Sequence, residues 1–99
     1  MRGFLELDRV VHEPARLAIL TVLAAAEEVE FRFLEKVTGL TRGNLSGHAT
    51  KLEAAGYITV HKAFRARTPV TSYRLTASGR AALVNYRATV RATMNLNNE

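Results

Sequence analysis

The chain has 99 residues, of which 47% are hydrophobic and 23% are charged, and these proportions are typical of one globular domain. It contains no cysteine, which excludes disulfides, thiolate metal ligands and a cysteine nucleophile. The net charge of +5 is uneven: residues 1–53 carry seven basic and eight acidic side chains, whereas residues 54–99 carry seven basic side chains and one acidic side chain. A basic half of this kind favours a polyanionic partner and an ordinary solvated basic surface about equally.

The sequence carries no sign of a targeting or membrane-spanning segment. Its first residues, "MRGFLELDRVV", bring charges among the apolar positions too early for a signal peptide. The longest apolar run, "LAILTVLAAA", has about half the length that spans a bilayer. We therefore expect a cytoplasmic protein that does not enter a membrane.

The first half of the chain predicts helices separated by short connections. "EPARLAILTVLAAA" predicts a helix because Pro14 suits a first turn and apolar residues follow at helical spacing, and a helical stretch is also expected over residues 4–11. "EVEF" has the β-branched and aromatic character of a very short strand. "FRFLEKVTG" predicts a helix that ends at Gly39, and another helix with Thr41 as its N-cap follows up to about Ala55. Two helices joined by so short a turn are typical of a helix-turn-helix.

The second half predicts a β-hairpin followed by a long helix. "YITVHKAF" and "TSYRLT" are rich in β-forming residues, and the basic loop "RARTP" between them closes at Pro69. The predicted fold is therefore α+β and mostly helical: a winged helix-turn-helix with a two-stranded wing hairpin and a C-terminal dimerisation helix. We expect one domain over residues 1–99, with the helix-turn-helix at about 31–55, the wing hairpin at about 57–76 and the C-terminal helix at about 77–95.

Three segments, "HEPARLAIL", "LTRGNLSGHATKLEAAGYI" and "YRLTASGRAAL", resemble the MarR/ArsR-like winged helix-turn-helix transcriptional regulators, close to the compact MarR-like winged helix DNA-binding domains. The resemblance covers about residues 8–90, with the motifs in the same order, and departs at Ala49, where the family usually has a leucine. It implies a sequence-specific, double-stranded DNA-binding transcriptional regulator that acts as a homodimer. The recognition helix, residues 41–55, would lie in the major groove, and the wing, residues 62–69, on the minor groove or the backbone.

The predicted recognition helix carries two glycines although glycine costs about 1 kcal/mol in a helix interior. At about 100° per residue, Leu45, Ala49 and Leu52 face the core, and Gly43 and Gly47 face away from it. Small side chains allow the helix backbone to come close to the major groove of DNA. The alternative is that the glycines are simply tolerated on an exposed helix face. From position and chemistry, the predicted DNA-binding residues are Arg42, Gly43, Asn44, Ser46, Gly47, Thr50, Lys51, Lys62, Arg65, Arg67 and Thr68.

The roles within this set follow from side-chain chemistry. Asn44 can pair with an adenine edge and Arg42 with guanine or a phosphate, whereas Lys51 is better suited to a phosphate. The wing arginines Arg65 and Arg67 suit a narrow minor groove, although an ordinary charged turn would look the same.

The C-terminal helix carries an apolar stripe longer than so small a core needs, and exposed apolar area of this kind usually marks an interface. The apolar N-terminal residues are its expected companions. The predicted interface of a symmetric homodimer comprises Phe4, Leu5, Leu7, Val11, Leu83, Tyr86, Val90 and Met94.

Other classes of function have weaker support. The chain lacks paired carboxylates, a nucleophile elbow, a Walker-type loop and HExxH, so we expect neither an enzyme nor a cofactor. A metal- or ligand-sensing ArsR-like repressor is one alternative. For a metal site this sequence offers only His12, His48 and His61, which are not at i,i+4 spacing, so no metal site is predicted. MarR relatives often bind ligands, which leaves a small-molecule effector open. A protein-interaction winged-helix module would need an apolar recognition face, whereas the face predicted here is polar and small. His48 is expected to be packed or phosphate-bonded rather than catalytic.

Overall fold

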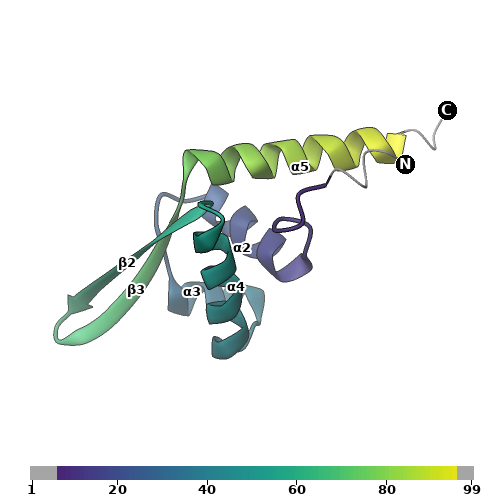
Figure 1. Ribbon diagram of the computed structural model, residues 1–99. Helices are drawn as coiled ribbons and strands as arrows, with labels where there is room; N and C mark the ends of the chain where they lie inside the picture. Colours follow the sequence, from purple (N-terminus) through teal and green to yellow (C-terminus); the bar gives the residue numbers. More distant parts are fainter. Residues whose placement is uncertain (1–6, 96–99) are drawn as a thin grey trace.

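The computed structural model describes residues 7–95, and the chain there folds into four helices and three strands. In chain order these are α2 (Pro14–Ala24), β1 (Val29–Glu30), α3 (Phe31–Thr38), α4 (Arg42–Ala54), β2 (Ile58–Arg65), β3 (Thr68–Leu75) and α5 (Ala77–Asn95) (Figure 1). This is the mostly helical winged helix-turn-helix that the sequence predicts. No helix within residues 7–95 is long and apolar enough to cross a membrane.

Local capping begins and ends the helices at the predicted places. The Glu13 carboxylate caps α2 by accepting hydrogen bonds from the backbone N–H groups of Ala15 (2.9 Å) and Arg16 (3.0 Å). Gly39 ends α3 in the left-handed conformation, at a φ of 72°, which glycine adopts without steric cost. Thr41 Oγ1 then accepts a hydrogen bond from the Asn44 N–H at 3.2 Å and starts α4.

The core lies where α2, α3 and α4 meet the base of the sheet, and α5 runs along one edge of the molecule and packs against α2 (Figure 1). Each of these elements contributes apolar side chains that are removed from water, which is the main source of stability. The largest fully buried side chains are Val11, Ile19, Leu20, Leu23, Leu34, Leu45, Leu52, Ile58 and Leu83.

The sheet is antiparallel, with the strand order β1-β3-β2. The very short β1 therefore adds a third strand to the expected two-stranded hairpin, pairing Val29 with Tyr73. The loop is also tighter than "RARTP" suggested, because Ala66 and Arg67 alone form the turn and Pro69 lies within β3 opposite Phe64.

The start of α5 approaches the base of the wing so closely that only glycine fits there. A Cβ on Gly79 would lie 2.1 Å from the Tyr57 carbonyl oxygen. Thr76 Oγ1 accepts a hydrogen bond from the Gly79 N–H at 2.9 Å and donates one to the Gly56 carbonyl at 2.7 Å. These contacts fix the first turn of α5 against the end of α4.

The expected helix over residues 4–11 is wrong for the part that the structure describes, where residues 9–11 form a turn and residues 7 and 8 are not helical. Asp8 explains the difference, because its Oδ1 accepts hydrogen bonds from the N–H groups of Val10 (2.8 Å) and Val11 (3.3 Å). A side chain that bonds nearby backbone groups in this way competes with helix formation. Phe4 and Leu5 lie outside the described residues.

Candidate nucleic-acid interface

The outer face of α4 is exposed and small, as predicted. Leu45, Ala49 and Leu52 are buried, whereas Gly43 and Gly47 are exposed. A Cβ built on either glycine meets no atom within 4 Å. Packing within residues 7–95 therefore does not require these glycines.

A groove of about 1000 Å³ runs between α4 and the wing. It brings together side chains that are far apart in the sequence, because the helix and the hairpin form its two walls. Seven of the predicted DNA-binding residues line it: Arg42, Gly43, Ser46, Thr50, Lys62, Arg65 and Thr68. The other four, Asn44, Gly47, Lys51 and Arg67, are exposed on α4 and at the turn but do not line the groove.

Arg42 is oriented by an aromatic ring at the entrance to α4. Its guanidinium carbon lies 5.7 Å from the centre of the Phe31 ring, within the range of a cation–π interaction. Phe31 is the first residue of α3, so this contact joins the two helices of the helix-turn-helix. Sequence reasoning assigned Phe31 to helix packing and missed this second role.

Arg65 already has an anionic partner in this structure. Its Nη2 donates to Glu30 Oε2 at 2.7 Å and its Nη1 to Glu30 Oε1 at 3.4 Å. The hydrogen bond from Arg65 holds the pKa of Glu30 below its ordinary value, and the same bond raises the pKa of Arg65. Sequence reasoning missed Glu30, because the two residues are 35 positions apart.

Every charged side chain of the wing is basic, and two residues at its tip have positive φ angles. Residues 58–75 contain Lys62, Arg65, Arg67 and Arg74 and no acidic residue. Ala66 and Arg67 have φ angles of 49° and 70°, a conformation that two-residue hairpin turns usually give to asparagine or glycine. Non-glycine residues held there store about 1–3 kcal/mol each. The tip thus carries an arginine where the backbone favours glycine.

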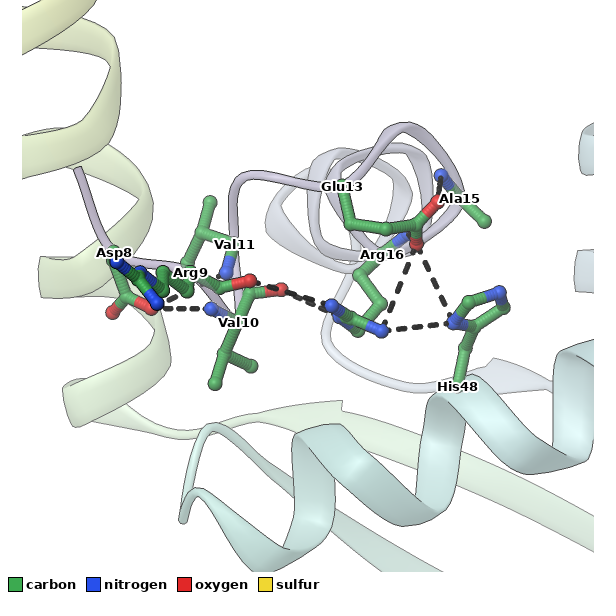
Figure 2. A network of polar contacts seen from close by, with 8 residues as sticks. All are labelled: Asp8, Arg9, Val10, Val11, Glu13, Ala15, Arg16 and His48. Atoms are coloured by element: carbon green, nitrogen blue, oxygen red, sulfur yellow. Dashed lines mark hydrogen bonds and ion pairs between the residues drawn. The ribbon is translucent and has the colours of Figure 1, made fainter. Parts of the chain in front are cut away.

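His48 belongs to a polar network on the side of α4 away from the groove, shown in Figure 2. Arg16 is its centre: Nε donates to the Val10 carbonyl at 2.6 Å, Nη2 to the Arg9 carbonyl at 3.3 Å, and Nη1 lies 3.2 Å from His48 Nδ1. Glu13 Oε2 lies 3.4 Å from the same His48 nitrogen. His48 is therefore packed within the fold, and sequence reasoning missed its partners Glu13 and Arg16 at the start of α2.

The charge of Glu13 is stabilised by this position. Burial alone would raise its pKa, but the N–H groups of Ala15 and Arg16 and the nearby His48 and Arg16 side chains outweigh burial and lower the pKa below its ordinary value of 4.5. Glu13 thus caps α2 and faces α4 as a carboxylate.

The predicted dimer interface needs correction. Leu7, Val11 and Leu83 are buried in the core of this chain, with exposures of 7%, 0% and 1%, so their apolar character has an explanation within one protomer. Tyr86 and Val90 are partly buried, and Met94 is exposed. These three line a groove of about 730 Å³ between α2 and α5, together with Leu17, Thr21, Arg87, Arg91 and Asn95.

The three histidines lie in three separate places. His12 Nδ1 lies 2.8 Å from the Tyr86 hydroxyl, His61 lies near Thr59, and His48 is in the Arg16 network. Over residues 7–95 the structure brings together no group of three histidine or acidic side chains that could hold a metal ion.

Comparison with known proteins places this fold in a family. A family model described as a winged helix DNA-binding domain matches residues 15–94. An uncharacterized protein of Methanocaldococcus jannaschii is 33% identical over 78 residues, which cover 79% of this chain and 85% of that protein.

Solved structures agree with this match. The transcriptional regulator homologue protein from Pyrococcus horikoshii OT3 is 26% identical, with a TM-score of 0.91 and coverage of 100% of both chains. The M. tuberculosis transcriptional regulator MOSR, solved in complex with DNA, is similar in fold, with a TM-score of 0.70 at 22% identity, over 86% of this chain and 60% of that one. This chain therefore belongs to the family of winged helix DNA-binding domains and has the fold of MarR-type transcriptional regulators.

Proposed function

We propose that this protein is a sequence-specific transcriptional regulator that inserts α4 into the major groove of double-stranded DNA. One observation carries the proposal. The outer face of α4 holds Gly43 and Gly47, which no packing contact within the described chain requires, on a surface without an acidic residue from Arg42 to Lys51. Each glycine makes the helix less stable than alanine would, and this loss is offset only if another surface must come close to the helix backbone. The major groove of DNA admits a helix at that distance.

In this proposal α4 recognises the base sequence, and the wing supplies positive charge that attracts DNA of any sequence. Asn44 is exposed in the first turn of α4, where its planar amide can read an adenine edge. Lys51 lies further along the same helix and suits a phosphate. Arg67 extends from the hairpin turn, where it supplies charge to the minor groove or the backbone.

The active form in this proposal is a homodimer that pairs two recognition helices. The surface groove lined by Tyr86, Val90 and Met94 offers apolar area beside Leu17 on α2. A second copy docked there would relate the two α4 helices by a two-fold axis, so that they read half-sites about 34–36 Å apart, one turn of DNA.

The test selects a binding site from random DNA with the intact protein and then compares variants on that site and on scrambled DNA across a salt series. Asn44→Ala should narrow the difference in affinity between the two DNAs and leave the salt slope unchanged, because a base contact is worth about 1–3 kcal/mol on the correct sequence alone. Arg67→Ala should weaken both DNAs alike and reduce the slope of log K by about one unit.

A matched control is Asn85→Ala, which removes the same amide from an exposed position on α5. It should change neither affinity nor slope. If Asn44→Ala and Arg67→Ala behave alike, the division between helix and wing is wrong. If the intact protein binds no DNA at low salt, the proposed function is wrong.

A further inference from the structure

Phe64 is a large apolar side chain that lies outside the hydrophobic core of residues 7–95. It is 77% exposed, more than any other large hydrophobic residue described; Met94, the next, is 60% exposed. It lies near the outer end of β2, directly opposite Pro69 on β3. Phe64 therefore lies near the tip of the wing, at the opposite end of β2 from the buried Ile58.

The surroundings of Phe64 indicate what it meets. Side chains alternate along a strand, so Phe64 shares a face of β2 with Val60 and Lys62, both of which line the groove beside α4. Arg67 follows three positions on, at the turn, and Arg65 comes next to Phe64 with its charge paired to Glu30; residues 58–75 themselves carry no acidic side chain. An apolar ring amid cations complements a polyanion that also offers apolar surface, as the sugar edges and base steps of a DNA minor groove do.

The hairpin ladder fixes where Phe64 lies relative to Arg67. The turn of Ala66 and Arg67 joins the strands through two residues, and the ladder pairs every residue from Ile58 to Arg65 with one on β3. Pro69, opposite Phe64, has a fixed φ angle and limits the local backbone further. The ring and Arg67 therefore approach a bound duplex together.

We propose that Phe64 is a minor-groove wedge, whose ring packs against deoxyribose and partly enters a base step, bending the duplex toward the major groove that α4 occupies. This inference rests on the proposed DNA-binding function. Pyrimidine–purine steps such as TA and CA/TG unstack most easily, so the wedge adds a sequence preference at positions that no hydrogen bond reads. Phe64 is thus a specificity-determining residue of the wing.

The experiment compares the intact protein with Phe64→Ala, Phe64→Leu and a control, Val84→Ala, which truncates a 56%-exposed apolar side chain on α5. Affinity is measured by fluorescence anisotropy on the selected site, and bending by energy transfer between dyes at the two DNA ends. Phe64→Ala should bind about tenfold more weakly, the order expected for one lost aromatic stacking contact, and should bend the duplex less. Phe64→Leu should restore part of the bend, because leucine also acts as a wedge, and Val84→Ala should match the intact protein.

A fluorescent adenine analogue placed at the wing-side step reports unstacking directly. Its emission should rise when the intact protein binds and should not rise with Phe64→Ala. Equal affinity and bending for Phe64→Ala and the intact protein would overturn the inference while leaving the proposed function standing. A lower melting temperature for Phe64→Ala would assign the ring a packing role and also overturn it, as would Phe64-dependent binding to phosphatidylglycerol vesicles without DNA bending. Failure of the intact protein to bind DNA would instead reject the proposed function.

Discussion

Replacing Gly47 by leucine separates the stability of α4 from its proposed use as a DNA-reading surface. Gly47 lies in the middle of α4, is exposed, and has no atom within 4 Å of an added Cβ. Leucine is the better helix former by about 0.5–1 kcal/mol, and no neighbour opposes it. In a domain of this size, each kcal/mol moves the melting temperature by about 4–8 °C, so Gly47→Leu should melt several degrees higher.

The same substitution should weaken DNA binding. A leucine side chain would stand between the helix backbone and the groove, so α4 must retreat and lose its base contacts. We expect affinity for the selected site to fall at least about tenfold, or ~1.4 kcal/mol, while binding to scrambled DNA through the phosphates changes less. Thermal unfolding and anisotropy titrations on one preparation measure both effects.

Two controls bracket this result. Gly79→Ala should lower stability by about 1–3 kcal/mol, because the new Cβ would overlap the Tyr57 carbonyl, which belongs to rigid backbone. Ala88→Leu adds a leucine to an exposed position on α5 and should leave DNA binding unchanged. Unchanged affinity of Gly47→Leu for the selected site would refute the explanation given for the glycines of α4.

Three further expectations follow from the contacts described. Glu30→Gln should release Arg65 for DNA, strengthening binding and steepening the salt slope by about one unit, as measured by titration across a salt series. Because the pKa of Glu13 is lowered in the folded state, its carboxylate stabilises the fold fully above its ordinary pKa of 4.5 and less as the pH falls through the lower folded value. Glu13→Gln should therefore reduce the difference in melting temperature between about pH 7 and about pH 3; an unchanged difference would contradict the assignment. Val90→Glu should yield monomers in sedimentation while the fold persists, since Val90 is only partly buried; a dimeric variant would place the interface elsewhere.

Local signals predicted the fold well because they act within a few residues. Gly39 and Thr41 mark the turn between α3 and α4 by conformation and capping alone, and the buried stripe of α4 follows from helical spacing. The sequence does not predict contacts between distant segments. The bond from Arg65 to Glu30 and that from Arg16 to His48 join residues 35 and 32 positions apart, and no periodicity encodes them.

Leu83 illustrates a second limit of the sequence. Its spacing on the last helix correctly indicated burial, but the sequence could not say whether this chain or another buries it. The structure places it at 1% exposure within one protomer. The DNA-contacting residues stay predictions, since their positions are now known and their contacts are not.

The two walls of the candidate interface differ in stiffness. The Arg16 network joins α4 to the N-terminal segment through charge-assisted hydrogen bonds (Figure 2). The inner face of α4 is also held by its buried leucines. Beyond Ser72, toward the tip of the wing, β3 no longer pairs with β1. The wing there is a two-stranded ribbon whose outer residues are exposed. Such ribbons bend and twist at low cost. A bound duplex would therefore take its position from the rigid helix, and the compliant wing would adjust to the local width of the neighbouring groove.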